Sequence, residues 1–209
     1  MIRIKKILIA NRGEIAVRII KAAKEMGIVC VVAYPPHDRL ALHVFKADEA
    51  YPIFSDKTEA YLDIDQLIDV ALKSGADAIH PGYGFLSENA LFARRVQSAG
   101  LQFIGPDHEA IATMGDKMKA KKMATSCGVP VIPGFELLET DEAYLRKQSE
   151  AIGFPVLIKA RAGGGGKGMR VVHEAKDLME QIGQAVSEAT AAFGDGGVLI
   201  ENTFKGPGI

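Results

Sequence analysis

Short apolar runs alternate with amphipathic helical segments along the first hundred residues, and this alternation constrains the fold more than any other feature. Residues 5–10 and 28–34 have the continuous apolar character of buried strands. Between them, apolar residues recur at helical spacing over 14–26, and Gly27 follows where a C-terminal cap is expected. The later elements expected are a helix at 61–73, a strand at 76–80, a helix at 88–98 and a strand at 101–104. Such alternation predicts an α/β fold with a parallel sheet that is covered by helices on both faces.

The character of the sequence changes after residue 105. A helical stretch around 114–126 is expected to act as a connector, and the turn-rich residues 128–134 follow it. The second unit is expected to contain a helix at 140–152, strands at 155–160 and 169–173, a helix at 175–192 and a strand at 197–201. We therefore predict a first domain at 1–105, a helical linker at 106–130, a small α/β domain at 131–203 and the truncated start of a further domain at 204–209.

Composition excludes several classes of function. The 209 residues carry a net charge of −1, so nucleic-acid or membrane-surface binding, which needs a basic surplus, is not expected. No apolar segment approaches the length of a membrane span. With only two cysteines, a disulfide framework is not expected either, and a reducing cytoplasm or organelle matrix fits the chain.

A glycine run between two predicted strands carries the sharpest chemical signal. Lys159 ends one strand, and glycines at 163–166 and 168 surround Lys167 before the next strand begins. Glycines allow backbone N–H groups to approach an anion closely, and lysines add positive charge at phosphate oxygens. The alternative is a flexible hinge with solvated lysines. The run is not a Walker A loop, because a strand rather than a helix follows it.

Several segments together resemble the N-terminal portion of biotin carboxylase, and the resemblance covers essentially the whole chain. Besides the glycine run, the segments that carry it are 6–16 (KILIANRGEIA), 47–50 (ADEA), 80–89 (HPGYGFLSEN), 103–106 (FIGP) and 114–117 (MGDK). The resemblance implies a Rossmann-like N-terminal domain followed by an ATP-grasp lid domain. It also implies truncation before the catalytic C-terminal domain.

The resemblance implies a role for particular residues. Lys117 and Lys159 would contact nucleotide phosphates, the glycine run would close over the triphosphate, and the methionine that follows would pack on the adenine. The implied ATP-binding residues are Lys117, Lys159, Gly163, Gly164, Gly165, Gly166, Lys167, Gly168, Met169, Glu201, Asn202 and Phe204. Tyr83 and Gly84 would lie near biotin and bicarbonate. Lys21 and Glu25 would contact a second copy in a homodimer.

Other interpretations of these residues stay open. Lys117 could be a solvated surface lysine, and Tyr83 could simply pack within a turn. His80 is expected to form a structural hydrogen bond rather than act as a base, and Arg12 and Glu14 could form a local pair. The sequence also departs from the family pattern after Glu201, where the expected ribose-contacting histidine is missing.

The family reaction implied is the ATP-dependent carboxylation of carrier-bound biotin by bicarbonate through carboxyphosphate. ATP, Mg²⁺ and biotin are the implied cofactors, and a biotin carboxyl carrier protein and a carboxyltransferase are the implied partners. Magnesium ligands and the general base would lie in a following domain, so no metal ligands and no complete catalytic set are expected in this chain, and it would be inactive alone. The alternative is a non-catalytic nucleotide-binding or interaction module.

Overall fold

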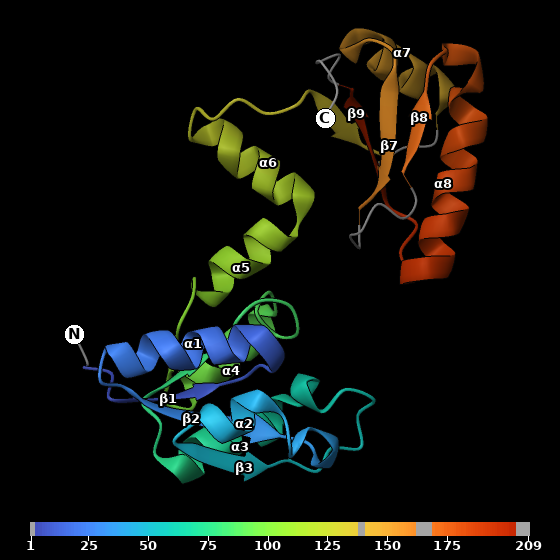
Figure 1. Ribbon diagram of the computed structural model, residues 1–209. Helices are drawn as coiled ribbons and strands as arrows, with labels where there is room; N and C mark the ends of the chain where they lie inside the picture. The colour runs from blue at the N-terminus through green and yellow to red at the C-terminus, as the bar shows by residue number, and fades with distance from the viewer. Residues whose placement is uncertain (1–2, 138–140, 162–168, 204–209) are drawn as a thin grey trace. The chain divides into compact units, whose positions relative to one another are not determined.

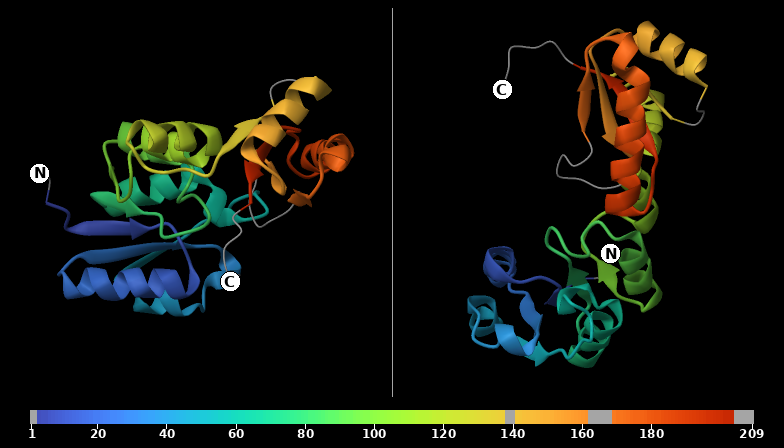
Figure 2. Two further views of the ribbon diagram at one scale, coloured as in Figure 1. Left: turned by 90° about the horizontal axis from the view of Figure 1, so that it is seen from above. Right: turned by 90° about the vertical axis from the view of Figure 1, so that its right-hand side faces the viewer.

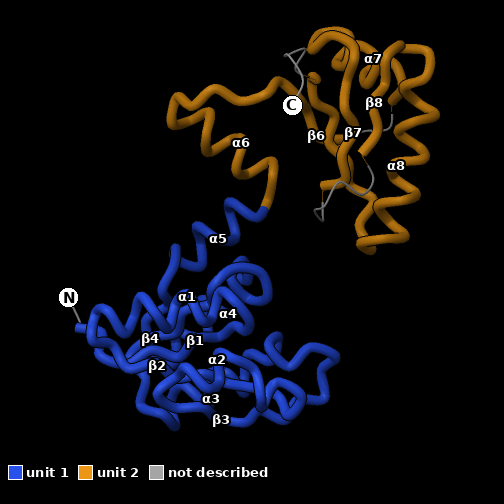
Figure 3. The backbone as a smooth tube through the Cα atoms, viewed as in Figure 1, with its two compact units in different colours: residues 1–115 blue, residues 116–209 orange. Residues whose placement is uncertain are grey.

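The computed structural model describes residues 3–137, 141–161 and 169–203 (Figure 1; two further views in Figure 2). The chain divides into two compact units, residues 1–115 and 116–209 (Figure 3). The helical linker predicted at 106–130 is divided between them, with its first part in unit 1 and its second part in unit 2.

Unit 1 contains a five-stranded sheet in the order β3-β2-β1-β4-β5, with every neighbouring pair parallel. Its strands are β1 (Lys6–Ile9), β2 (Val29–Tyr34), β3 (Glu49–Pro52), β4 (Ala78–His80) and β5 (Gln102–Phe103). Its helices are α1 (Gly13–Glu25), α2 (Leu42–Lys46), α3 (Ile64–Ser74), α4 (Ala90–Ser98) and α5 (His108–Gly115), with short 3-10 turns η1 (Pro36–Asp38) and η2 (Ala60–Leu62). The predicted parallel α/β sheet is confirmed, while α2 and β3 were not expected.

Two hydrophobic cores sandwich this parallel sheet. Leu8 of β1 and Val31 of β2 face one core with apolar side chains of α3 and α4. Ile7 and Ile9 face the opposite core, which α1 completes. Alternate residues of one strand thus point to different cores, so both faces of the sheet are withdrawn from water.

The helical stretch predicted around 114–126 consists of parts of two helices. One helix, α5, ends at Gly115, and a second, α6 (Lys117–Ser126), begins two residues later. Asp116 is the N-cap of α6, because its carboxylate accepts hydrogen bonds from the backbone N–H groups of Met118 and Lys119, both at 3.0 Å. An N-cap residue adopts extended backbone geometry, which interrupts the helical path there.

Unit 2 contains a four-stranded antiparallel sheet in the order β6-β9-β7-β8. Besides α6, its elements are β6 (Gly134–Glu136), α7 (Glu142–Ile152), β7 (Val156–Ala160), β8 (Arg170–Val172), the 3-10 turn η3 (Ala175–Asp177), α8 (Leu178–Phe193) and β9 (Val198–Asn202). A single core joins one face of the sheet to α7 and α8 through Ile158, Ile200, Leu145 and Leu178. Strand β6 was not expected from the sequence.

None of the helices within the described ranges combines the length and the apolarity needed to cross a bilayer.

Candidate functional site

The carboxylate of Glu201 is the centre of a polar cluster in unit 2. In the β7–β9 register, Glu201 lies opposite Leu157, so Lys159, two residues further along β7, shares its face of the sheet. The ammonium group of Lys159 is 2.6 Å from Glu201 Oε2. Lys121 contacts the other oxygen, with its Nζ atom 2.7 Å from Oε1. One buried carboxylate therefore holds two lysine side chains.

Helix α6 supplies two lysines because they are four residues apart and share one helix face. Lys121 forms the contact with Glu201 described above, and Lys117 directs its Nζ atom to the end of β7. There it donates to the carbonyl oxygens of Ala160 at 3.1 Å and Arg161 at 3.5 Å. The spacing Lys117–Lys121 was visible in the sequence, but Lys121 was not singled out.

The environment of Glu201 keeps the carboxylate ionised. Burial alone raises the pKa of Glu201, but hydrogen bonds from Lys121 and Lys159 outweigh it, so the pKa lies below its ordinary value. Gly134 pairs with Glu201 across β6 and β9, and a Cβ atom at Gly134 would lie 2.9 Å from Glu201 Cγ and 2.6 Å from the carbonyl oxygen of Ile200. A glycine is therefore needed beside this carboxylate.

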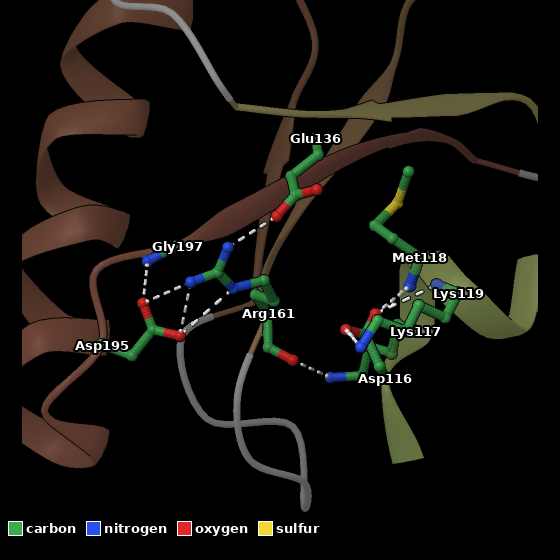
Figure 4. Close-up of polar contacts among 8 residues, drawn as sticks. All are labelled: Asp116, Lys117, Met118, Lys119, Glu136, Arg161, Asp195 and Gly197. Atoms are coloured by element: carbon green, nitrogen blue, oxygen red, sulfur yellow. Dashed lines mark hydrogen bonds and ion pairs between the residues drawn. The ribbon is translucent and has the colours of Figure 1, made fainter. Parts of the chain in front are cut away.

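Arg161 fixes the end of β7 where the glycine run begins (Figure 4). Its guanidinium group lies between two carboxylates, 2.7 Å from Glu136 and 3.0 Å from Asp195, with bidentate geometry at Asp195. The pKa of Asp195 is lowered first by the N–H of Gly197 and then by Arg161. A Cβ atom at Gly197 would lie 2.7 Å from Arg161 Nε, so glycine allows this close packing. Sequence reasoning did not single out Arg161.

Of the remaining residues predicted to bind ATP, the structure describes some and leaves the others outside its described ranges. Met169 is described, and 48% of its surface is exposed. The side-chain amide of Asn202 donates to the carbonyl oxygens of Ile152 and Gly153, and its backbone N–H donates to Pro133. Outside the described residues lie Gly163, Gly164, Gly165, Gly166, Lys167, Gly168 and Phe204. Their roles, and those of the described residues, stay predictions.

In unit 1, the turn after β4 presents Tyr83 and Gly84 at the carboxyl edge of the sheet. The side chain of Asn11, which follows β1, is 2% exposed and donates to the carbonyl oxygens of Pro81 at 2.7 Å and Tyr83 at 2.8 Å. Gly82 has a φ of +67°, and a Cβ atom there would lie 2.7 Å from Asn11 Nδ2. Two hydrogen bonds from the Asn11 amide and a glycine turn therefore shape this loop.

The exposed ring of Tyr83 lines a small pocket. Its hydroxyl donates to the carboxylate of Glu14. The pocket has a volume of about 370 Å³, and residues 11–15 and 83–85 line it, so it includes Gly84. Cavities at the carboxyl ends of parallel strands are the usual ligand sites of such sheets.

Two neighbouring residues have structural partners. His80 Nδ1 accepts a hydrogen bond from the N–H of Gly82 at 3.0 Å, which confirms the expected structural hydrogen bond, and burial lowers the pKa of His80. Arg12 pairs with Asp38 at 3.2 Å, and among the described residues no ion pair joins it to Glu14, so the local pair that the sequence left open is not formed. The reason is that η1 brings Asp38 to the start of α1, while Glu14 accepts from a tyrosine instead.

The residues predicted to contact a second copy lie together on α1. Lys21 and Glu25 are exposed, are four residues apart, and line one groove between α1 and α2 with the exposed ring of Phe45. Among the described residues, no group of three or more histidine, cysteine, aspartate or glutamate side chains could hold a metal ion.

Comparison with known families assigns both units. The family described as "Biotin carboxylase, N-terminal domain" matches residues 3–111, and "Carbamoyl-phosphate synthase L chain, ATP binding domain" matches residues 116–208. These two matches meet close to the division between units 1 and 2.

Individual relatives resemble the chain over nearly its whole length. Pyruvate carboxylase of Schizosaccharomyces pombe is 49% identical over 97% of this chain, which spans 17% of that protein. The 2-oxoglutarate carboxylase small subunit of Hydrogenobacter thermophilus is 45% identical, and the chain spans 43% of it. The chain thus spans less than half the length of each of these curated relatives.

Solved structures agree with these relatives. The biotin carboxylase domain dimer of the Hydrogenobacter thermophilus 2-oxoglutarate carboxylase, determined with MgADP, ADP and bicarbonate, has a TM-score of 0.87 and 44% identity. Biotin carboxylase of Campylobacter jejuni, in a β,γ-ATP complex, has a TM-score of 0.88 and 46% identity. Each comparison covers 98% of this chain, and 45% and 46% of those two chains respectively.

Proposed function

The chain belongs to the biotin carboxylase family, and from this premise we propose that it binds the nucleotide and part of the biotin substrate in ATP-dependent carboxylation of carrier-bound biotin. In this reaction, a bicarbonate oxygen attacks the γ-phosphorus of ATP, which gives carboxyphosphate and ADP. Carboxyphosphate then releases CO2 and phosphate, and a deprotonated biotin nitrogen captures the CO2. The residues proposed for the nucleotide lie in unit 2, and those proposed for biotin and bicarbonate lie in unit 1.

The observation that carries the proposal is the lysine cluster around Glu201. An ammonium group has three N–H donors, and within the described residues Lys159 uses one of them, toward Glu201. Its remaining donors suit phosphate oxygens, and the low pKa of Glu201 keeps a negative partner beside the lysine when no phosphate is bound. Lys117 and Lys121 add positive charge from α6. This arrangement fits a polyanion better than a neutral ligand.

The chemistry asked of these residues is electrostatic. Phosphoryl transfer spreads negative charge over the transferred group, and fixed cations stabilise that charge without moving a proton. Magnesium, when bound, would supply further positive charge to the phosphates, and no group of metal-ligating side chains is found for it within the described part of this chain. The Arg161–Asp195 pair would hold the end of β7, so that Lys159 keeps its position.

Tyr83 and Gly84 are proposed to line the biotin and bicarbonate pocket, because they border the cavity at the carboxyl edge of unit 1.

Lys21 and Glu25 are proposed to meet their counterparts in a second copy, where opposite charges would face each other across a two-fold axis. A biotin carboxyl carrier protein and a carboxyltransferase are the proposed partners. The cytoplasm or an organelle matrix is the proposed compartment, since Cys30 and Cys127 are free thiols.

Calorimetric titration of the chain with MgATP tests the nucleotide assignment. We expect weak binding to the wild type and a further loss of roughly tenfold or more in Lys159→Ala, because a phosphate would lose a charged partner. Lys176→Ala is the matched control, since the ammonium group of Lys176 pairs only with Glu174 among the described residues and its side chain is 71% exposed. Equal MgATP affinity in wild type and Lys159→Ala would contradict the assignment.

A second arm tests turnover. The chain spans 45–46% of the two solved biotin carboxylase chains above, and we expect biotin-dependent ADP release only when the remaining part of such a chain is supplied. MgATP binding without ADP release in the supplemented mixture would instead favour a non-catalytic nucleotide-binding module.

A further inference from the structure

Four polar side chains at the carboxyl edge of unit 1 form a hydrogen-bonded chain, and of these four only Arg12 lines the pocket assigned above to biotin. The Tyr61 hydroxyl donates to Asp38 Oδ2 at 3.0 Å, and Arg12 Nε lies 3.2 Å from the same oxygen. His43 Nε2 is 3.2 Å from the Tyr61 hydroxyl. We refer to Arg12, Asp38, His43 and Tyr61 as the Tyr61 network.

The Tyr61 network is buried at one end and reaches the surface at the other. His43, Tyr61 and Asp38 are 1%, 0% and 7% exposed, whereas the side chain of Arg12 is 42% exposed. Because the Tyr61 hydroxyl donates its hydrogen bond to Asp38, its oxygen accepts one from the Nε2–H of His43, and His43 Nδ1 is the unprotonated atom. That buried Nδ1 has no partner among the described residues. Each hydrogen bond at the Tyr61 hydroxyl therefore has a defined donor and acceptor, and the hydroxyl is held between His43 and Asp38.

The ring of Tyr61 connects this network to the turn after β4. Phe85 stacks on it with ring centroids 5.4 Å apart and an angle of 23° between the planes. Phe85 has a φ of +36° and is, among the described residues, the one non-glycine residue with a positive φ. A side chain disfavours that geometry, so it persists only where neighbouring groups hold it. Tyr61 holds the turn at Phe85, and Asn11 holds it at Pro81 and Tyr83.

We propose that Tyr61 is a positioning residue for the turn that carries Tyr83 and Gly84, and that Asp38, His43 and Arg12 act by fixing the orientation of the tyrosine ring. The proposal deepens the proposed function and rests on it, because that turn is assigned there to the biotin pocket. Tyr61 itself would not touch biotin. Its effect would reach the pocket through Phe85 and the backbone of Gly84.

Nuclear magnetic resonance of the ¹⁵N-labelled chain tests the proposal without any ligand. In Tyr61→Phe, which keeps the ring and removes the hydroxyl, we expect shifted amide signals for Gly84 and Phe85. We also expect the Ser87 amide, which donates to the carbonyl oxygen of Gly84 at 2.9 Å, to exchange roughly fivefold to tenfold faster. Tyr51→Phe is the matched control, because it removes a hydroxyl bonded to Glu49 on β3.

A conservative pair at the buried end separates positioning from general packing. His43→Leu removes the donor to Tyr61 and should reproduce the changes at Gly84 and Phe85, whereas His43→Gln keeps an N–H donor and should restore most of the wild-type signals. Arg12→Ala, at the exposed end, is least at risk of misfolding. Unchanged Gly84 and Phe85 signals in every variant that folds would overturn the proposal. Such a result would leave the MgATP and turnover experiments untouched, so the two failures are distinguishable.

Discussion

The two units place their candidate functional side chains in different ways. In unit 1, cores cover both faces of a parallel sheet, so the polar groups gather in loops at its carboxyl edge. In unit 2, one face of an antiparallel sheet packs on α7 and α8, and the strands carry Lys159 and Glu201 on the other face. Strand register therefore sets the site in unit 2, whereas buried hydrogen bonds and strained turns set it in unit 1.

The largest expected effect tests whether each unit depends on its own core. Leu8 in unit 1 and Ile158 in unit 2 are both fully buried. We expect Leu8→Ala and Ile158→Ala to lower the free energy of unfolding of their own unit by about 2–5 kcal/mol, because each leaves a cavity. Urea denaturation followed through amide signals of each unit measures this. If the amide signals of both units showed one common unfolding transition in both variants, the two units would not unfold independently and the comparison between them would fail.

The next effect concerns the buried carboxylate of unit 2. We expect Glu201→Gln to destabilise unit 2 by about 2–4 kcal/mol, because two partly buried lysines lose their counter-charge. The matched control is Asp65→Asn in unit 1, which removes an exposed partner of Arg95 and should cost less than about 1 kcal/mol. Equal decreases in the free energy of unfolding, measured by urea denaturation, would mean that the burial of Glu201 does not add to its contribution to stability.

The smallest expected effect is the loss of stability at acidic pH. Burial lowers the pKa of His43 and of His80, both in unit 1. Below about pH 6.5 the unfolded chain therefore binds more protons than the folded protein. The contribution of the two neutral histidines to the free energy of unfolding is complete above that pH, and it declines as the pH falls toward their folded pKa values. The loss is at most about 1.4 kcal/mol per pH unit for each histidine.

Unit 2 should respond at lower pH. The pKa of Glu201 is lowered, so its contribution is present above the ordinary glutamate pKa of about 4.3 and is lost only below it. Urea midpoints measured for each unit at pH 7.5 and pH 5.5 compare the two. An equal decrease in both units would contradict this difference, and His43→Gln should reduce the decrease in unit 1.

Sequence periodicity predicted most of the sheet and helix framework. The strands at 6–9 and 29–34 and the helix at 13–25 follow from apolar runs and spacing alone. Short elements such as α2 and β3 were missed, because four or five residues carry too little periodic signal. The break at Asp116 was missed because a capping aspartate inside a helical pattern resembles an ordinary polar position.

The candidate sites were predictable to different degrees. Lys159 stood out because it ends a strand before the glycine run, whereas Lys121 became significant only through its 2.7 Å contact with Glu201. Similarly, Tyr83 belonged to a distinctive segment, but Asn11 and Tyr61, which hold its turn, lie 72 and 22 residues earlier in the chain. Such partners are brought together by topology, and local patterns do not encode them.

The amino-acid sequence by itself determined the α/β class, the change of character between the two units, the glycine run and the family resemblance, because each depends on composition or on neighbouring residues. Only the tertiary structure decided that Glu201 holds two lysines, that Arg12 pairs with Asp38 rather than Glu14, and that Phe85 rests on Tyr61. Each of these contacts joins residues 24 to 80 positions apart. These contacts depend on strand order and register, because order and register decide which side chains come close enough to form ion pairs and hydrogen bonds.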